Sequence, residues 1–592
     1  MNNQARRRIK ALLLAFTIGF VTIAGKVTYI QVVHGEDYRQ QSLNRRLVTQ
    51  KLEGNRGKIL DRNEEEIVSN RKTKNIYLVP VDYQDALSKD EDGKLGYEKD
   101  SKAIADILKL DKEDVEKVLK KEKSYYRLLK RDVSEEDVIA LKELDIPGIG
   151  FENATVRSYP QGNLAANLIG FTNIENIGLE GLESKYEDVL AGEQGLIISE
   201  TDRYGNKLPD KQHEYYESKE GNSLVLTIDS QIQYIVEEEI KRAVKEDGVN
   251  PNGMSVIVQD TKTGEILAMG NYPSFNPENK GNVSAELRKN LNVQLNYEPG
   301  SVFKLVTVAA ALDSKSISPT DIIHDSQGYI TVAGHSIRNS NRKPGESMTL
   351  SKAVGESNNV AMVQIGQKMG KNVLYNYIDK FGFGKKTGID VYGEEKGLLK
   401  NVEDVTNLDL ATNTIGQSIM VTPIQICNAV SAIANGGKLM QPYLVKEIRD
   451  SDGNVVEKTE PTVVSQVISE QTSSEMKKIM ESVVSEYGGK NAYVEGYRVG
   501  GKTGTAQKVG ESGGYASGKY IASFAGIVPA NDPQYTIMVV IDEPKGYSYY
   551  GGSTAAPIAG NIIKQIMLYK NIPAFEEISD TKEVSTGNKV GD

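Results

Sequence analysis

Apolar and polar positions in the second half of the chain follow the periods of strands and of buried helices. Short apolar or alternating runs predict strands, at residues 254–259, 265–271, 497–507, 520–528 and 535–542. Longer apolar runs predict helices, at residues 302–312, 423–434 and 556–569. Because the strands come from both ends of this region around a helical middle, they predict an α/β (α+β) fold, with a central antiparallel sheet covered by helices.

The first half of the chain is more charged, and its elements are less distinct. Segments 101–121 and 133–144 have the pattern of amphipathic helices with solvated charged faces. Charged residues at 207–221 are typical of a linker. The pattern changes at Ser223–Ile228, which alternates as a strand, and an amphipathic helix is expected at 231–244.

The N-terminus carries a membrane-targeting pattern. A basic segment at 1–10 precedes an apolar stretch at 11–33 that Lys26 interrupts. About 20 apolar residues span a bilayer, and a lysine in such a helix extends toward the interface. The positive-inside rule then places the basic flank in the cytoplasm and the rest of the chain outside. The alternative is a cleaved signal peptide, since Thr22-Ile23-Ala24 is a tolerable cleavage site.

The membrane segment and the change of pattern after residue 221 together predict how the chain is organised. The last residues are polar and lack apolar periodicity, which predicts a disordered tail. We therefore expect a cytoplasmic segment, a transmembrane helix, two successive external domains and a tail, at residues 1–10, 11–33, 34–221, 222–572 and 573–592.

Composition argues against several classes of function. The net charge of -10 argues against a nucleic acid as the main partner. Cys427 is the single cysteine, so neither an intramolecular disulfide nor a thiolate metal cluster is expected. The four histidines lack metal-ligand spacing, so we expect no metal and no other cofactor.

The main catalytic candidate is the pattern Ser-x-x-Lys, whose spacing on a helix places a serine nucleophile and a lysine base on one face. It occurs five times, at Ser69/Lys72, Ser301/Lys304, Ser340/Lys343, Ser474/Lys477 and Ser579/Lys582. Only Ser301 follows the helix-start signal Glu298-Pro299-Gly300 and leads into a helix that is apolar nearly all round. Burial in that helix would lower the pKa of Lys304, as a base requires, so we favour Ser301 and Lys304.

Lys-Thr-Gly occurs three times, at residues 262–264, 386–388 and 502–504. Only the third copy lies inside a predicted strand, where glycines on both sides would let a ligand backbone approach closely. Strand alternation places Thr503 and Thr505 on the same face. That face is suited to a substrate carboxylate, with Lys502 adding positive charge.

Two further candidates are weaker. Ser357-Asn358-Asn359 has the form Ser-x-Asn, which means little without the other motifs. Ser512 lies in Gly510–Gly514, which matches the nucleophile elbow of hydrolases. That stretch lacks a strand before it and a helix after it, so we interpret it as a loop.

In their order and spacing, the motifs resemble those of class B penicillin-binding proteins, the monofunctional peptidoglycan transpeptidases. The three motifs are Ser301-Val302-Phe303-Lys304, Ser357-Asn358-Asn359 and Lys502-Thr503-Gly504-Thr505-Ala506. Other stretches look like the same family, at residues 381–384, 387–390, 416–417, 422–423, 550–552 and 555–557. The resemblance covers about residues 40 to 570.

The region before the catalytic motifs also resembles class B proteins, which separates this chain from β-lactamases and small carboxypeptidases. Three stretches look like motifs of the family's noncatalytic pedestal domain, at residues 56–63, 157–162 and 181–192. The resemblance implies that Arg56 pairs with Glu183. Glu64 departs from the glycine that the family usually has, which puts the local turn in doubt.

The resemblance implies a serine transpeptidase domain on an extended pedestal, with a role for each catalytic residue. Ser301 attacks the D-Ala-D-Ala carbonyl of a peptidoglycan stem peptide, and Lys304 accepts its proton. Ser357 helps to relay a proton to the departing D-alanine. Asn359 positions Lys304 and the substrate amide. A second stem-peptide amine then resolves the acyl-enzyme, whereas β-lactams are trapped at this stage.

The resemblance also implies how the substrate is held. Lys502 and Thr503 bind the terminal carboxylate together with Thr505, and Gly504 belongs to the same substrate-binding strand. Backbone N–H groups of Ser301 and Thr505 form the oxyanion hole, where losing one donor typically costs about 3–4 kcal/mol.

The implied partners are peptidoglycan stem peptides, β-lactam antibiotics, the cell membrane, a polytopic glycosyltransferase and division or sporulation proteins. Overall resemblance favours division or sporulation over elongation, although the sequence leaves the pathway open. Two rival functions also stay open. One is transfer of the acyl group to water, as in a β-lactamase or carboxypeptidase. The other is a sensor or scaffold with a silent active site, which the three intact motifs argue against.

Overall fold

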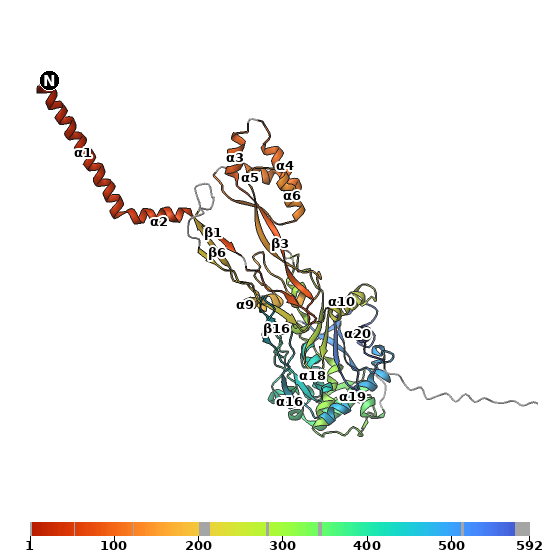
Figure 1. Ribbon diagram of the computed structural model, residues 1–592. Helices are drawn as coiled ribbons and strands as arrows, with labels where there is room; N and C mark the ends of the chain where they lie inside the picture. Colours follow the sequence, from red (N-terminus) through yellow and green to blue (C-terminus); the bar gives the residue numbers. More distant parts are fainter. Residues whose placement is uncertain are drawn as a thin grey trace, which may run out of the picture. The chain divides into compact units, whose positions relative to one another are not determined.

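The computed structural model of the chain (Figure 1) describes most of its residues, namely 3–52, 54–90, 92–121, 123–200, 214–279, 283–340, 346–510 and 514–574. Its contacts divide the chain into two compact units. One comprises Met1–Arg56 and Ala191–Gly221, and the other comprises Gly57–Leu190 and Asn222–Asp592. The predicted domain boundaries stay predictions, and most of the expected tail lies outside the described residues.

The first unit contains two helices and a small antiparallel sheet. Helix α1 (Asn3–Val33) is followed by α2 (Gly35–Arg46). Strands β1 (Leu47–Leu52), β6 (Gly195–Glu200) and β7 (Glu214–Tyr216) pair in that order. Among the described residues, α1 alone is long and apolar enough to cross a membrane, and it has no buried side chain. The prediction of a linker at 207–221 is wrong at Glu214–Tyr216, where β7 forms. The two tyrosines of β7 favour a strand.

In the second unit, the part before residue 190 is built on strand β3 (Glu66–Leu78). This strand pairs antiparallel with β4 (Arg127–Val133) and β5 (Ile149–Ser158). Four helices accompany it, α3 (Pro80–Ser88), α4 (Tyr97–Leu108), α5 (Lys112–Leu119) and α6 (Glu135–Glu143). Their apolar side chains bury Ile76 and Leu78 of β3 in a separate small core.

The helix expected at 101–121 is instead two helices, α4 and α5. Lys109 adopts the left-handed conformation with a φ of 52° and ends α4. Asp111 then caps α5 by accepting the N–H groups of Glu113 and Asp114. The prediction of one helix is wrong because both halves share an amphipathic pattern, whereas a short local cap starts a new helix between them.

A larger sheet connects this part to the rest of the second unit. Strand β2 (Ile59–Leu60) pairs with β3 and, in parallel, with β8 (Ser223–Leu226). Strand β8 then pairs with β16 (Val445–Arg449), and β16 pairs with β17 (Val455–Lys458).

The turn between β2 and β3 contains Glu64, the residue that departs from the family's glycine. Glu64 has a φ of 69°, in the region that glycine adopts at little cost, and its N–H donates to Asp61 O at 3.1 Å. The turn that the sequence put in doubt is therefore present, with a glutamate in a conformation that favours glycine.

Two of the pedestal stretches meet in a buried ion pair. Arg157 of β5 donates from Nε to Glu183 Oε1 at 2.6 Å, and both side chains are fully buried. Glu183 belongs to α8 (Gly181–Lys185). The pairing of Arg56 with Glu183 stays a prediction. Because breaking a buried pair costs about 3–5 kcal/mol, this contact gives the two stretches a structural role.

The central sheet of the second unit has five antiparallel strands. Their order is β10 (Ile266–Tyr272), β9 (Gly253–Asp260), β21 (Tyr535–Asp542), β20 (Tyr515–Val528) and β19 (Gly500–Val509). The last three strands of the chain form the expected meander, and β20 begins earlier than expected because its hairpin with β19 is longer. The predicted fold class, a central antiparallel sheet covered by helices, is confirmed.

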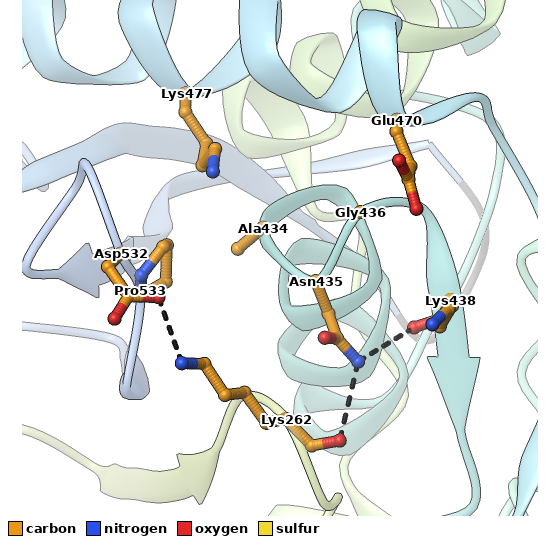
Figure 2. Close-up of a pocket in the computed structure, with 9 residues that line it drawn as sticks. All are labelled: Lys262, Ala434, Asn435, Gly436, Lys438, Glu470, Lys477, Asp532 and Pro533. Atoms are coloured by element: carbon orange, nitrogen blue, oxygen red, sulfur yellow. Dashed lines mark hydrogen bonds and ion pairs between the residues drawn. The ribbon is translucent and has the colours of Figure 1, made fainter.

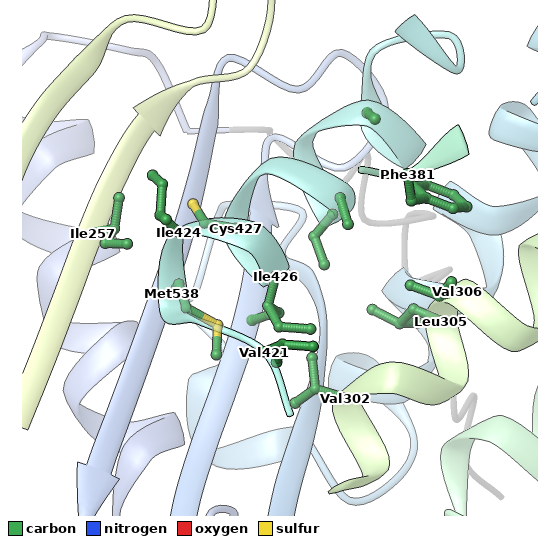
Figure 3. Close-up of a cluster of buried hydrophobic side chains, with 14 of the residues drawn as sticks. Ile257, Val302, Leu305, Val306, Phe381, Val421, Ile424, Ile426, Cys427 and Met538 are labelled. Carbon is green, nitrogen blue, oxygen red and sulfur yellow. The ribbon is translucent and has the colours of Figure 1, made fainter. Parts of the chain in front are cut away.

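Helices cover both faces of this sheet. Helices α10 (Ser230–Lys245) and α20 (Ala555–Tyr569) pack on one face. Helix α18 (Pro423–Ala434) lies on the other face, and α13 (Lys304–Asp313) packs against it. Figure 3 shows Ile257 and Met538 of the sheet beside side chains of α18. The hydrophobic core on the α18 face of the sheet includes α13, the helix that follows Ser301.

Further elements complete the second unit around this core. The helices are α7 (Ala166–Ile169), α9 (Glu187–Leu190), α11 (Ala285–Arg288), α12 (Leu291–Gln294), η1 (Gly300–Phe303), α14 (Leu350–Gly355), α15 (Asn359–Met369), α16 (Lys371–Lys380), η2 (Val402–Asp404), α17 (Asn407–Asn413), α19 (Glu470–Ser485) and η3 (Lys490–Ala492). The strands form three antiparallel pairs, β11 (Ile322–His324) with β14 (Ser347–Thr349), β12 (Tyr329–Val332) with β13 (His335–Arg338), and β15 (Lys438–Met440) with β18 (Val463–Gln466).

Candidate active site

Ser301 lies where the chain turns into the buried helix α13. The serine belongs to the 3-10 turn η1, and α13 begins at Lys304. Because residues i and i+3 lie above one another in a 3-10 turn, Ser301 and Lys304 share one face. Ser301 is half-buried and therefore accessible, whereas Lys304 is fully buried.

Ser357 connects the serine to the lysine. Its hydroxyl donates to Ser301 Oγ at 2.8 Å, and Lys304 Nζ donates to Ser357 Oγ at 3.0 Å. Lys304 also donates to the backbone oxygen of Ser357 and to Asn359 Oδ1, both at 2.7 Å. The four predicted catalytic residues Ser301, Lys304, Ser357 and Asn359 therefore form one hydrogen-bonded group.

The turn before α15 presents Ser357 and Asn359 to this lysine. Ser357 has a φ of 58°, in the left-handed region that few residues other than glycine adopt. Asn358, between them, is buried and caps α15 by accepting the N–H of Ala361 at 2.8 Å. The residues on either side of the cap, Ser357 and Asn359, can therefore contact the same lysine nitrogen.

The edge strand β19 lies directly against η1. A Cβ added at Gly504 would come 2.9 Å from Val302 Cγ2 and 3.1 Å from Pro299 O. A Cβ added at Gly300 would come 3.2 Å from Ala506 Cβ. The two glycines therefore allow the strand to approach the turn that carries the serine.

The remaining predicted site residues lie on β19. Lys502 is 1% exposed, and its Nζ donates to Thr503 O at 3.0 Å. Thr503 and Thr505 are the half-buried positions in an alternation with buried neighbours. Thr505 Oγ1 accepts the N–H of Gly551 at 3.0 Å. The strand thus places the two threonines on one side and a buried lysine on the other.

Burial changes the acid–base properties of both lysines. Burial, and after it the positive charge of Lys502, hold the pKa of Lys304 well below its usual value. Burial lowers the pKa of Lys502 to about 7. A lysine with a strongly depressed pKa is neutral near pH 7 and can accept a proton. Lys304 is therefore suited to act as a base toward the Ser357–Ser301 hydroxyl pair.

The sequence did not predict the hydrogen bonds of Glu298, which lies just before the turn that contains Ser301. Its buried carboxylate accepts the N–H of Ser418 at 2.8 Å and the O–H of Tyr515 at 3.1 Å, and burial raises its pKa. Next to it, Gly300 N–H donates to Gly416 O at 3.0 Å. These contacts fix the turn before Ser301. Their partners are distant in sequence, so the only local signal was a glutamate before Pro-Gly.

The competing motifs lie elsewhere. Ser69 is in β3, Ser474 is an exposed residue of α19, and the first Lys-Thr-Gly copy is in the turn between β9 and β10. The second copy is a loop in which Thr387 donates to Glu394. Four other candidates lie outside the described residues, Lys343, Ser512, Ser579 and Lys582.

A separate pocket of about 250 Å³ is lined by residues from several loops and by α19 (Figure 2). Lys262 pairs with Asp532 at 2.9 Å in its wall, and Lys438, Glu470 and Lys477 also face it. None of the predicted site residues lines this pocket. In the part of the chain that the structure describes, no group of three His, Cys, Asp or Glu side chains is arranged to hold a metal ion.

Two family models match this chain. The penicillin-binding protein transpeptidase domain matches residues 254–564, and the penicillin-binding protein dimerisation domain matches residues 51–226. Among curated proteins, Stage V sporulation protein D of Bacillus subtilis is 38% identical over 605 residues, covering 100% of this chain and 91% of the relative. Peptidoglycan D,D-transpeptidase FtsI of Escherichia coli K12 is 31% identical, covering 93% of this chain and 90% of the relative.

Solved structures show the same fold. A peptidoglycan synthetase of Bifidobacterium adolescentis has a TM-score of 0.70 and 27% identity, covering 90% of this chain and 99% of its own. Penicillin-binding protein 3 of Mycobacterium tuberculosis, complexed with aztreonam, has a TM-score of 0.67 and 26% identity, covering 89% and 98%. Together with the Ser301, Ser357 and Lys502 motifs, these matches establish that the chain belongs to the class B penicillin-binding proteins.

Proposed function

We propose that this penicillin-binding protein is a peptidoglycan D,D-transpeptidase that cross-links stem peptides through an acyl-enzyme on Ser301 and binds β-lactams covalently at the same residue. The observation that carries the proposal is the hydrogen-bonded path from an accessible serine, through Ser357, to the buried lysine Lys304. The names of the relatives as peptidoglycan D,D-transpeptidases support the reaction and its substrate class.

In the acylation step, Ser301 Oγ attacks the carbonyl carbon of the penultimate D-alanine. The proton of Ser301 passes to Ser357 Oγ while the hydroxyl proton of Ser357 passes to the lone pair of neutral Lys304 Nζ, so negative charge builds on the carbonyl oxygen rather than on the serine. Backbone N–H groups of Ser301 and Thr505 are the proposed donors to that oxyanion. The tetrahedral intermediate collapses when the C–N bond breaks, and a proton passes through Ser357 to the departing D-alanine nitrogen.

In the second step, the amine of another stem peptide attacks the ester carbonyl and loses a proton to Lys304. Ser301 leaves as the hydroxyl, and a new peptide bond replaces the ester. Asn359 Oδ1 and Ser357 O hold the lysine nitrogen in place during both steps.

The third motif is proposed to bind the donor's terminal carboxylate. Thr503 and Thr505 provide hydroxyl donors along β19, Gly504 allows close approach, and Lys502 provides positive charge beneath them. The pKa of Lys502 near 7 in the free protein would rise when a carboxylate binds, since an opposite charge favours the ammonium form. Binding of the substrate carboxylate would thereby stabilise the positive charge of Lys502, which in turn attracts that carboxylate.

We place the catalytic domain outside the membrane, with α1 as a single-pass anchor and residues 1–10 in the cytoplasm. The apolar length of α1 and its basic flank support this placement. The proposed organisation remains a pedestal at 34–221 and a transpeptidase domain at 222–572. A polytopic glycosyltransferase and division or sporulation proteins are the proposed partners, and the similarity to a protein named for stage V of sporulation supports the sporulation pathway.

The test uses the purified full-length chain in detergent with a donor pentapeptide ending in D-Ala-D-Ala and a peptide amine as acceptor. Mass spectrometry should detect the cross-linked peptide and released D-alanine. Ser301→Ala should abolish both, whereas Ser474→Ala, which alters another Ser-x-x-Lys copy, should retain both. Release of D-alanine with only hydrolysed donor would instead favour a carboxypeptidase, and neither product from the wild type would favour a silent site.

A further inference from the structure

Asp325 is a buried acid that belongs to none of the recognised motifs. It follows strand β11, is 2% exposed, and accepts three hydrogen bonds. The donors are Asn339 Nδ2 at 2.6 Å, Asn358 Nδ2 at 2.8 Å and the N–H of Gly328 at 2.8 Å. Among the described residues, no basic side chain forms an ion pair with it.

These donors keep Asp325 ionised. Burial raises the pKa of Asp325, but hydrogen bonds from Asn358, Gly328 and Asn339 outweigh it, so that its pKa lies below the usual value. A carboxylate only accepts hydrogen bonds, so it fixes both asparagine amides with their NH2 groups toward Asp325. The amide oxygens must then point the other way.

Both amide oxygens hold the first turn of α15. Asn339 Oδ1 accepts the N–H of Asn359 at 2.9 Å and the N–H of Val360 at 3.2 Å. Asn358 Oδ1 accepts the N–H of Ala361 at 2.8 Å. Asp325 therefore stabilises, through two intermediates, the backbone from Asn359 onward, directly after Ser357.

We propose that Asp325 is a positioning residue for acylation: by orienting Asn339 and Asn358, it holds Ser357 and Asn359 in contact with Lys304. Asp325 itself touches neither Ser301 nor Lys304, so it acts only through this turn. The inference rests on the proposed function of the Ser301 site. Acylation would then require Asp325, which lies outside the three motifs in a polar segment with no catalytic pattern.

The test compares Asp325→Asn with wild type in the full-length chain. An asparagine has one oxygen, so it can accept either from the two amides, which share Oδ2 of Asp325, or from the N–H of Gly328, which donates to Oδ1, and at least one of the three hydrogen bonds is lost. Because misplacing catalytic groups by about 1 Å can cost about 10²-fold in rate, we expect a comparable loss in the second-order rate of acylation by a fluorescent penicillin. Asp390→Asn is the matched control, since Asp390 also accepts three hydrogen bonds, from Tyr186, Leu444 and Val445.

The pH profile separates positioning from lost stability. Ser357 O and Asn359 Oδ1 stabilise the charged form of Lys304, so loosening them should lower its pKa further. The acidic limb of the acylation profile should then move to lower pH in Asp325→Asn and stay unchanged in Asp390→Asn. An Asp325→Asn rate within threefold of wild type, or a lower rate with an unmoved acidic limb, contradicts the proposal.

A double variant covers the case in which Asp325→Asn fails to fold. Asp325→Asn/Asn358→Asp restores one donor–acceptor pair and keeps an oxygen to cap α15, so it should recover part of the lost acylation. No recovery in a folded double variant contradicts the proposal. Ser301→Ala, measured in parallel, tests the proposed function separately: if it still reacts with penicillin, that function fails, whatever Asp325 does.

Discussion

At the residue scale, the hydroxyl of Ser357 connects the nucleophile Ser301 to the base Lys304 by hydrogen bonds. The sequence predicted Ser301 and Lys304 from a helix-start signal and an apolar helix, because local patterns report burial. The local pattern did not predict that Ser357 would lie between them, since that contact joins residues from two separate turns, and only the resemblance to the family implied a relay role for Ser357. Glu298 and Asp325 escaped prediction for the same reason: their partners come from distant segments, and hydrogen bonds between segments leave no local pattern.

The two active-site lysines should respond differently to replacement by arginine. Lys304 must be neutral to accept a proton, and arginine stays protonated at any working pH. Because general base catalysis contributes about 10²–10⁴-fold, Lys304→Arg should lower the penicillin acylation rate by that order. Lys502→Arg keeps a positive charge under β19 and should lose much less. The check is the second-order acylation rate of each purified variant, and equal rates for the two would mean that Lys304 is not the base.

The pH dependence of acylation should reflect the protonation of both Lys304 and Lys502. As pH falls through the pKa of Lys304, the base becomes protonated and the rate should drop. Since burial and then the charge of Lys502 depress that pKa, Lys502→Gln should raise it and move the acidic limb to higher pH. In the wild type, binding should weaken as pH rises through about 7, where Lys502 loses its charge. An acidic limb that does not move in Lys502→Gln would contradict the coupling of the two lysines.

At the scale of elements, long apolar runs were predicted well and short polar pairs were missed. Helix α18 has the expected bounds because its apolar run is capped by Thr422 and begins with a proline. Strand pairs such as β12 with β13 are mostly exposed, so they lack the alternation that marks a half-buried strand. The break between α4 and α5 was missed because a single cap overrides a continuous amphipathic pattern.

The contact between β19 and η1 makes a prediction about glycine. An alanine at Gly504 would crowd both β20 and the turn, with its Cβ nearest to Ser523 Oγ and 2.9 Å from Val302 Cγ2. Gly270, on the opposite edge strand of the same sheet, is a matched control, since its Cβ would come 2.5 Å from Val236 Cγ1. Both variants should lose about 1–3 kcal/mol of unfolding free energy, measured by denaturant unfolding.

Only Gly504→Ala should slow acylation, because only its strand carries the carboxylate-binding face. The measurement is the acylation rate per folded molecule. Equal rates for Gly504→Ala and Gly270→Ala would show that the distance between strand and turn does not limit the reaction.

At the scale of the whole molecule, the family and the fold class were predictable from the order of the motifs. Residues far apart in sequence meet at one edge of a five-stranded sheet, as the three motifs required. The arrangement before residue 222 was less predictable. There, β2 and β3 share a sheet with β8, β16 and β17, and the segment expected as a linker contains β7. Pairing between distant strands depends on the whole fold, which local patterns do not report.

The topology of the chain can be tested in intact cells. If α1 remains as an uncleaved anchor, protease added to spheroplasts should digest nearly everything after about residue 34, and the short N-terminal segment should stay protected. Mass spectrometry of the untreated protein should find the original N-terminus. A mature N-terminus near Gly25 would instead identify a cleaved signal peptide, and a protected ectodomain would contradict the orientation.

The most direct test of the account is to locate the penicillin adduct. The full-length chain is labelled with a penicillin, digested, and analysed by peptide mass spectrometry, with Ser301→Ala treated in parallel. Because Ser301 is accessible and is linked through Ser357 to the buried base Lys304, we expect a single adduct on the peptide that contains it and none in the variant. An adduct on Ser512 or on another Ser-x-x-Lys serine, or undiminished labelling of Ser301→Ala, would contradict the assignment of Ser301 as the nucleophile.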